Sequence, residues 1–232
     1  MQRIVISNNC LASCIYRDII NIPQPTPFVW NVIQQDDFIK LIKNFDSINF
    51  LNFEVDFDTV AQEYYLLIDG LVKVYYTHYK YKKDAEEKYT GFEPGHGYMT
   101  YTNKVIEYIT EEYVKRVNRL LKAKEEGAEF IFFYDSGCFQ SWVESIDTYL
   151  NRKHKEISAL VKINTKHKIV VSHWEDDYIT NLEHNDNVSF ILKPYDEEKN
   201  SIYSMNDEAV YMYDNILKKL INEDTETKEI LA

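Results

Sequence analysis

Apolar runs and stretches of helical spacing alternate along this chain. Residues 4–6 and 130–134 are apolar without polar alternation, which is typical of strands buried on both faces. Further strands are predicted at 168–172 and 188–192. Apolar residues spaced three and four apart predict helices or amphipathic segments at 11–19, 36–45, 103–126, 139–150, 157–161 and 206–222. Strands separated by helices imply right-handed crossovers. The pattern therefore predicts an α/β fold, specifically a three-layer sandwich with a mixed, mainly parallel sheet.

One part of the chain departs from this alternation. Residues 64–79 hold two runs rich in β-branched and aromatic residues, joined by Asp69-Gly70. Both central residues of a tight hairpin turn need positive φ, and Asp-Gly is a sequence that adopts it readily. Residues 52–57 alternate between apolar and polar, which indicates a strand with one face in water. We therefore expect one β-hairpin inside the mixed sheet.

The ends of two helices carry recognisable signals. Asp36 is placed to cap the helix at 36–45, and Gly127 suits the position just after the helix at 103–126. The prolines at 23, 25 and 27 exclude helix from that stretch and predict an extended path that runs over an edge of the sheet.

Composition narrows the class of protein. Of the 232 residues, 45% are hydrophobic and 15% aromatic, so the chain can bury a sizeable core. We expect a single α/β domain over residues 1–222, followed by an acidic, frayed tail at 223–232. The formal net charge is −12, and no basic stripe offsets it. This balance argues against nucleic acid, and against an anionic membrane surface, as a partner.

Cysteine usage and hydropathy indicate the compartment. The three cysteines are an odd number in a mid-sized chain, which favours reduced thiols over a disulfide framework. No apolar run approaches the roughly 18 residues of a membrane span. The N-terminus also lacks the basic and apolar regions of a signal peptide. We therefore expect a cytoplasmic protein without a membrane span, and the oligomeric state stays open.

The first predicted strand runs through a polar turn into helical spacing, and Asn8, Asn9 and Cys10 stand at that junction. In an open α/β sheet, ligands usually bind at the carboxyl ends of strands, where unpaired N–H groups begin the next helix. A helix N-terminus favours thiolate, so Cys10 is a candidate nucleophile, with a small core residue as the alternative. We expect one asparagine to cap the helix and the other to face a substrate.

A second junction repeats this design. The strand at 130–134 runs into Asp135, Ser136 and Cys138 before helical spacing resumes. If the two strands are neighbours in the sheet, these groups face Cys10 across one crevice. The site would then hold two asparagines, one carboxylate and up to two thiols, with Asp135 in a catalytic role and Ser136 and Cys138 toward the substrate.

Two histidines end predicted strands. His173 directly follows the strand at 168–172 and can act as general base toward Cys10 or a sugar hydroxyl, with a half-buried structural histidine as the alternative. His78 is a candidate substrate ligand. The spacing of cysteines and histidines matches no zinc site, and no glycine-rich loop joins a strand to a helix. No metal is predicted, and the cofactor stays unknown.

Several of these segments resemble a bacterial family named for exopolysaccharide biosynthesis. The matching pieces lie in order along the chain: ISNNC at 6–10, IYRDI at 15–19, Thr26-Pro27, DDFIKLIKNFD at 36–46, THYKYKKDAEEKY at 77–89, KRVNR at 115–119 and FFYDSGC at 132–138. The chain departs from the family at Leu11-Ala12-Ser13 and by an insertion between Tyr89 and Lys115. Through NNC, PFVW and KRVNR it is also similar to a family described as papain-like cysteine peptidases. The first resemblance implies a cell-surface polysaccharide context.

Three functions are compatible with these residues. The first is an enzyme of cell-surface polysaccharide (exopolysaccharide or capsule) biosynthesis or modification, which transfers a group to a sugar or polysaccharide precursor at the strand ends. The second is a cysteine-dependent hydrolase or acyltransferase, with Cys10 as nucleophile and His173 as base. The third is a non-catalytic carbohydrate-binding or partner-binding module, which the 19 tyrosines and three tryptophans suggest because aromatic rings stack on sugar faces.

Overall fold

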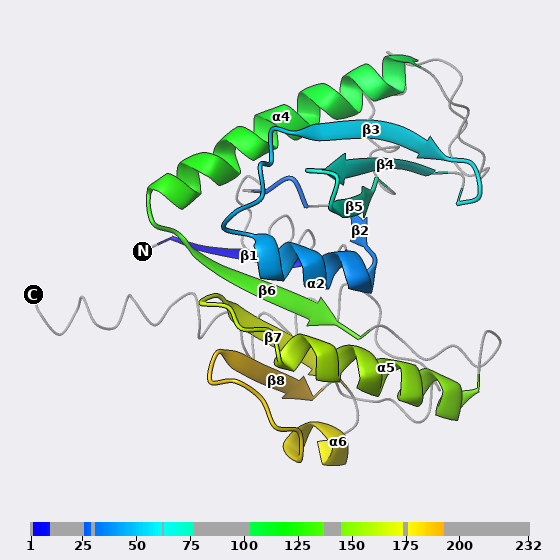
Figure 1. Ribbon diagram of the computed structural model, residues 1–232, viewed down its shortest axis with the longest axis vertical. Coiled ribbons are helices and arrows are strands. Elements are labelled where there is room, and N and C mark those ends of the chain that lie inside the picture. Colours follow the sequence, from blue (N-terminus) through cyan, green and yellow to red (C-terminus); the bar gives the residue numbers. More distant parts are fainter. Residues whose placement is uncertain are drawn as a thin grey trace, which may run out of the picture. The chain divides into compact units, whose positions relative to one another are not determined.

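The computed structural model describes residues 2–9, 26–28, 31–61, 63–76, 103–136, 145–173 and 176–192, and Figure 1 shows their elements. This part of the chain divides into two compact units. The first unit contains residues 2–7 and the described residues from 127 onward, and the second contains residues 8–9 and those between 26 and 126. The second unit is thus inserted into the chain of the first. A single domain over 1–222 stays a prediction.

The first unit contains a parallel sheet of four strands in the order β1-β6-β7-β8 (Figure 1). These strands are β1 (Arg3–Ser7), β6 (Glu129–Asp135), β7 (Lys168–His173) and β8 (Val188–Leu192). All three pairings are parallel, and Ser7 pairs with Phe133 where β1 ends. The predicted α/β class is confirmed, and the first strand and the strand at 130–134 are neighbours.

β6 lies between β1 and β7 and is buried from Phe130 to Asp135. A strand that is paired on both edges and covered on both faces exposes no position for a polar side chain, which explains its apolar run. At its amino end, Glu129 Oε2 accepts a hydrogen bond from Arg3 Nε at 2.7 Å, which ties β6 to β1.

Helix α5 (Ile146–Val161) packs against one face of this sheet. The Ser145 hydroxyl caps it by accepting a hydrogen bond from the backbone N–H of Thr148. The sequence pattern predicted separate segments at 139–150 and 157–161, whereas the structure has one helix across 146–161. The reason is that one apolar stripe continues along the helix to the buried side chains of Ile157 and Leu160. A short helix, α6 (Asp176–Thr180), follows β7.

The second unit contains an antiparallel sheet of four strands in the order β2-β5-β4-β3. The strands are β2 (Val32–Ile33), β3 (Phe53–Asp58), β4 (Glu63–Ile68) and β5 (Val72–Tyr75). Asp69 and Gly70 turn the hairpin between β4 and β5 with φ of 53° and 63°, as predicted. The hairpin lies in this second sheet and not inside the parallel sheet. Its strands pair with each other, with β2 and with β3, so they complete an antiparallel sheet of their own.

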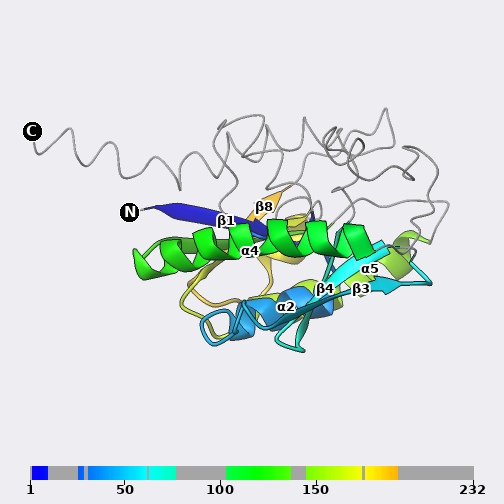
Figure 2. The same cartoon turned by 90° about the horizontal axis from the view of Figure 1, so that it is seen from above.

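The antiparallel sheet has one face that is buried along β4 and β5 and one face whose residues are half-buried or exposed. On β4, Tyr64, Leu66 and Ile68 are 0% exposed, whereas the residues between them are half-buried. The helix α4 (Asn103–Glu125) runs alongside β3, as Figures 1 and 2 show. Its Tyr113 ring centroid lies 4.5 Å from that of Phe53, and the Tyr113 hydroxyl donates to the Phe50 carbonyl at 3.0 Å. Helix α4 therefore contributes to the core on the buried face.

The helix signals were right at one end and wrong at another. Gly127 follows α4 with φ of 76°, a conformation that glycine adopts without strain. Asp36, however, is not the cap of α2 (Gln35–Asn44). Gln34 occupies the N-cap position without a side-chain hydrogen bond. Asp36 lies in the first turn, where its negative charge interacts favourably with the helix dipole. The helices predicted at 11–19 and 206–222 lie outside the described residues.

Candidate active site at the strand ends of the first unit

The carboxyl ends of β6 and β7 bring four polar residues together. β6 ends at Asp135 and is followed by Ser136, and β7 ends with Ser172 and His173. Asp135 pairs with Ser172 in the sheet, and the backbone N–H of Ser136 donates to the Ser172 carbonyl at 3.3 Å. These residues are between 0% and 6% exposed. Because the strands are parallel, all four residues lie at the carboxyl-terminal end of the sheet, where α/β proteins usually bind ligands.

Asp135 and Ser172 lie on one face of the sheet. The Ser172 hydroxyl donates to Asp135 Oδ1 at 3.4 Å. Ser7 of β1 pairs with Phe133, two residues before Asp135, so side-chain alternation places Ser7 on this face as well. All three side chains are buried. This face therefore has a polar end made by three neighbouring strands.

His173 lies on the opposite face, together with Ser136. The Nδ1 atom of His173 is 3.3 Å from the Ser136 hydroxyl oxygen, and both residues are 0% exposed. The Tyr149 hydroxyl of α5 donates to the Ser136 carbonyl at 3.2 Å and so holds this residue against the helix. If Nδ1 carries the proton and donates it to Ser136, Nε2 carries the basic lone pair. In that tautomer, the contact with Ser136 orients the His173 ring, as a general base requires.

Two further aromatic rings pack around His173. His154 of α5 and Tyr178 of α6 stack with ring centroids 3.6 Å apart and planes 8° apart. The ring of His173 meets them edge-on, at 5.9 Å from His154 and 6.0 Å from Tyr178. The Tyr178 hydroxyl donates to the His154 carbonyl at 2.7 Å and shares a hydrogen bond with Ser158 at 2.8 Å. This packing fixes the orientation of the His173 ring.

A carboxylate of α5 is buried on the same face. The Tyr134 hydroxyl donates to Glu156, which also forms ion pairs with Lys153 at 2.9 Å and Arg152 at 3.3 Å. Burial, followed by the neighbouring Glu156 charge, raises the pKa of Tyr134 far above its usual value. Tyr134 therefore stays a hydrogen-bond donor at neutral pH.

The structure brings together some of the predicted site residues and separates others. Ser136 and His173 meet, whereas side-chain alternation places Asp135 on the opposite face of the sheet from His173. Ser136, rather than Asp135, is therefore the side chain seen beside the His173 ring. Asn8 and Asn9 follow β1 and belong to the second unit, where the Asn8 carbonyl accepts a hydrogen bond from Ile33 at 2.9 Å.

The other candidates lie outside the described residues, namely Cys10, Cys138 and His78. Their roles stay predictions. Conversely, sequence analysis missed His154, Tyr178 and Glu156, which come from α5 and α6. No spacing in the sequence identifies these residues as part of a site. They lie on helices, and how those helices pack against β6 and β7 depends on contacts between distant segments. A search for polar residues on the buried side of α5 would have found Glu156, which is 9% exposed.

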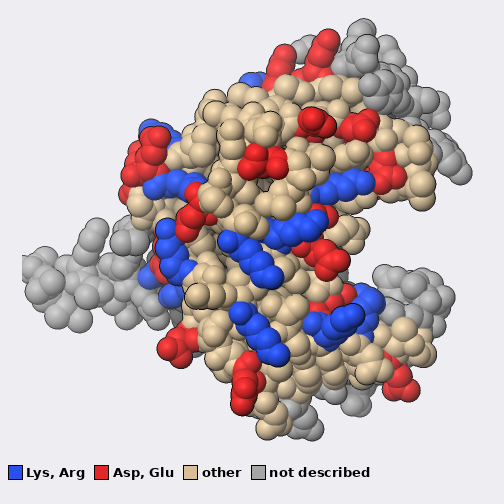
Figure 3. Space-filling model, viewed as in Figure 1, with Lys and Arg blue, Asp and Glu red and all other residues tan. Residues whose placement is uncertain are grey.

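Three further observations concern the described residues. In this part of the chain, no group of three or more His, Cys, Asp or Glu residues is arranged to hold a metal ion. Within the same ranges, no helix has the length and apolar character needed to cross a membrane. Figure 3 shows Lys and Arg side chains lying among Asp and Glu side chains on the face in view.

Comparison with known proteins adds one likeness. Residues 2–93 match a family described as Domain of unknown function (DUF1919). That segment is less than half of the chain; it includes β1 and strands β2 to β5, but ends before β6 and β7. No curated protein and no solved structure matches this chain.

Proposed function

We propose that the chain is an enzyme that modifies, or transfers a group to, a cell-surface polysaccharide precursor. The observation that carries this proposal is the pairing of His173 with Ser136 at the carboxyl ends of two parallel strands. The polysaccharide context is supported by the resemblance of segments such as ISNNC at 6–10 and FFYDSGC at 132–138 to the exopolysaccharide family.

In the proposed mechanism, His173 acts as general base. In the tautomer that carries its proton on Nδ1, His173 donates a hydrogen bond to the Ser136 hydroxyl, and Nε2 is left to take the proton from a hydroxyl of the acceptor sugar as that hydroxyl attacks. The nearby rings of His154 and Tyr178 hold the imidazole plane, so it does not have to reorient during the reaction. Asp135 and Ser172, on the other face, stabilise the strand ends through their own hydrogen bond.

Replacement of His173 by Gln tests this proposal. A positioned general base contributes about 10²- to 10⁴-fold to a rate, so we expect the modified polymer to fall by about two orders of magnitude or more. The measurement is the sugar and substituent composition of polymer extracted from producing cells that carry the variant. His184→Gln is the matched control, because His184 is exposed, lies near the Leu182 carbonyl and meets the Phe190 ring edge-on at 5.0 Å, away from His173 and Ser136 among the contacts described. An unchanged polymer in cells that carry folded His173→Gln protein would contradict the proposal.

A cysteine-dependent hydrolase or acyltransferase is the second candidate. Its support is that β1 and β6 are parallel neighbours, so the strand that leads to Cys10 ends at the same sheet edge as the strand that leads to Ser136. Alkylation by iodoacetamide at neutral pH separates the two candidates. An activated Cys10 thiol should react at least about tenfold faster than free cysteine, and Cys10→Ser should remove that fast phase while Cys14→Ser keeps it. A rate equal to that of free cysteine argues against a cysteine nucleophile.

A further inference from the structure

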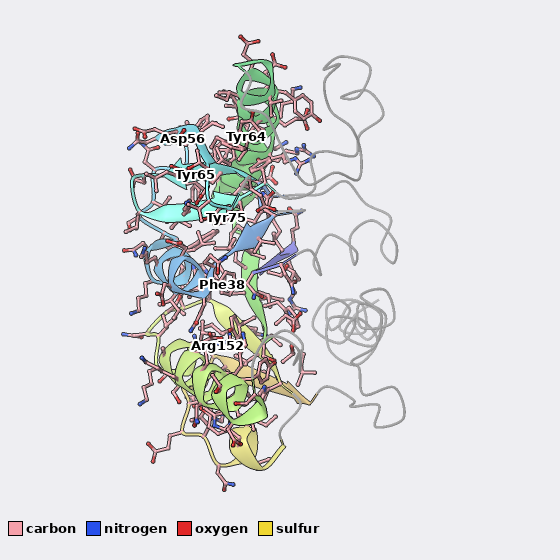
Figure 4. All side chains as sticks on the ribbon, turned by 90° about the vertical axis from the view of Figure 1, so that its right-hand side faces the viewer. Phe38, Asp56, Tyr64, Tyr65, Tyr75 and Arg152 are labelled. Atoms are coloured by element: carbon pink, nitrogen blue, oxygen red, sulfur yellow. The ribbon has the colours of Figure 1, made fainter. Side chains whose placement is uncertain are left out.

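The half-buried face of the antiparallel sheet carries a row of aromatic and charged side chains. Strand pairing places Asp56 across from Tyr65, and Tyr65 across from Tyr75. Lys73 reaches over both rings, with its Nζ 3.9 Å from the Tyr65 ring centroid and 4.6 Å from that of Tyr75. Figure 4 shows Asp56, Tyr65 and Tyr75 on the side of the sheet away from α4, and Tyr64 on the side toward it. We call the surface formed by Asp56, Asp58, Tyr65, Lys73 and Tyr75 the tyrosine face.

Hydrogen bonds hold the tyrosine face in one arrangement. The Tyr65 hydroxyl donates to Asp56 Oδ2 at 3.0 Å. Asp58 Oδ2 accepts from the Tyr75 hydroxyl at 3.0 Å and from Lys73 Nζ at 2.8 Å. The other oxygen of Asp58 accepts two backbone N–H bonds from the turn after β3. A surface whose rings are already fixed loses little conformational entropy when it binds a ligand.

The chemistry that this face offers is specific. Tyr65 and Tyr75 each donate their only hydroxyl hydrogen to a carboxylate of the face. Their oxygens, like the carboxylate oxygens of Asp56, can therefore still accept a hydrogen bond from a ligand. The rings add apolar surface beside these acceptors. A complementary ligand therefore carries several O–H donors next to an apolar C–H face, and a pyranose sugar has that combination.

The charge of the face selects among sugars. Strand alternation and pairing place Glu54 and Glu63 on the same face as Asp56 and Asp58, so among the described residues four carboxylates lie on the face that carries the Lys73 ammonium. Hydrogen bonds from Lys73, the backbone and Tyr75 hold the pKa of Asp58 well below its usual value, so this carboxylate is ionised at neutral pH. An acidic sugar would be repelled by such a surface.

We propose that the tyrosine face binds neutral sugar residues of a polysaccharide. This proposed binding site shares no residue with the strand-end site of the first unit, and the proposal does not depend on the proposed enzyme activity. Lys73 is 27% and Asp58 is 19% exposed, so both side chains are within reach of a ligand in solution. The face thus adds a means of holding a polymer that the strand-end chemistry alone does not supply.

Binding of defined oligosaccharides to the full chain tests the proposal. The probes are cello-oligosaccharides, malto-oligosaccharides and dextran fragments as neutral ligands, and oligogalacturonate as the acidic comparison, measured by titration calorimetry and amide NMR shifts. We expect at least one neutral probe to bind, with shifts in β3, β4 and β5, and oligogalacturonate to bind at least about tenfold more weakly. Shifts confined to the ends of β6 and β7 would overturn the tyrosine face while leaving the proposed enzyme intact.

Paired variants distinguish recognition from folding. Tyr75→Ala should lower the affinity about tenfold or more, whereas Tyr75→Phe, which keeps the ring and loses only the hydroxyl acceptor, should lower it by a smaller factor of about three to five. Lys73→Met provides a second variant in case Tyr75→Ala does not fold. It removes the Lys73 ammonium, so it should widen the preference for neutral over acidic ligands. Absence of binding by every neutral probe, equal affinity for the acidic one, or a dimer in sedimentation that Tyr75→Ala dissociates would each overturn the proposal.

Discussion

Replacing Phe132 by alanine is expected to lower the free energy of unfolding by about 3–5 kcal/mol. Phe132 is 0% exposed and sits in the middle of β6, between Ile6 of β1 and Ile169 of β7. Its ring also packs edge-on against His167, with centroids 5.6 Å apart. Because β6 is paired on both edges, the neighbouring strands cannot move in to fill the cavity that the smaller side chain leaves.

Urea unfolding followed by far-ultraviolet circular dichroism measures this loss. Val60→Ala is the matched control, because Val60 is 93% exposed and its truncation should change stability by less than about 0.5 kcal/mol. A loss below about 1 kcal/mol for Phe132→Ala would mean that β6 is not the packed centre of the first unit.

Alkaline pH is expected to destabilise the protein through two buried tyrosines. Burial raises the pKa of Tyr113 well above its usual value of 10.0, and burial together with the Glu156 charge does the same for Tyr134. A raised pKa means that the folded chain keeps a proton that the unfolded chain releases. The stability that each tyrosine contributes is therefore fully present below pH 10 and is lost as pH rises above it. Between its unfolded and its folded pKa, each tyrosine should lower the free energy of unfolding by about 1.4 kcal/mol per pH unit.

The stability–pH curve and the phenolate absorbance both report this effect. Below the alkaline transition, the native protein should show fewer ionised tyrosines than the same chain in denaturant. Tyr113→Phe and Tyr134→Phe should each flatten the decline in stability above pH 10, although Tyr134→Phe also loses the hydrogen bond to Glu156. If the double variant declines as steeply as the original protein, these two tyrosines are not the cause.

Much of the fold could be predicted because its signals are local. The apolar run of β6 and the Asp69-Gly70 turn each specify their own backbone, and the structure has a strand and a hairpin at those positions. The membership of the hairpin in a second sheet was not predictable in this way. Which strands pair depends on contacts between distant segments, and turn chemistry carries no information about them.

The candidate site shows the same limit more sharply. The sequence places Asp135 and His173 at strand ends, but whether they share a face depends on the register between β6 and β7. The observed register pairs Asp135 with Ser172, so it turns His173 to the other face. The contributions of His154 and Tyr178 depend on how α5 and α6 dock, which the apolar periodicity of a helix constrains only roughly.

The insertion of one unit into the chain of the other has a consequence for biosynthesis. β1 leaves the ribosome before the other strands described, yet its partner β6 begins only at Glu129. At typical elongation rates this interval is on the order of ten seconds. During that time Ile4, Val5 and Ile6, which the finished protein buries, have no sheet to join. Residues 31–125 can meanwhile complete the antiparallel sheet, so the nascent chain should acquire its inserted unit before the one that encloses it.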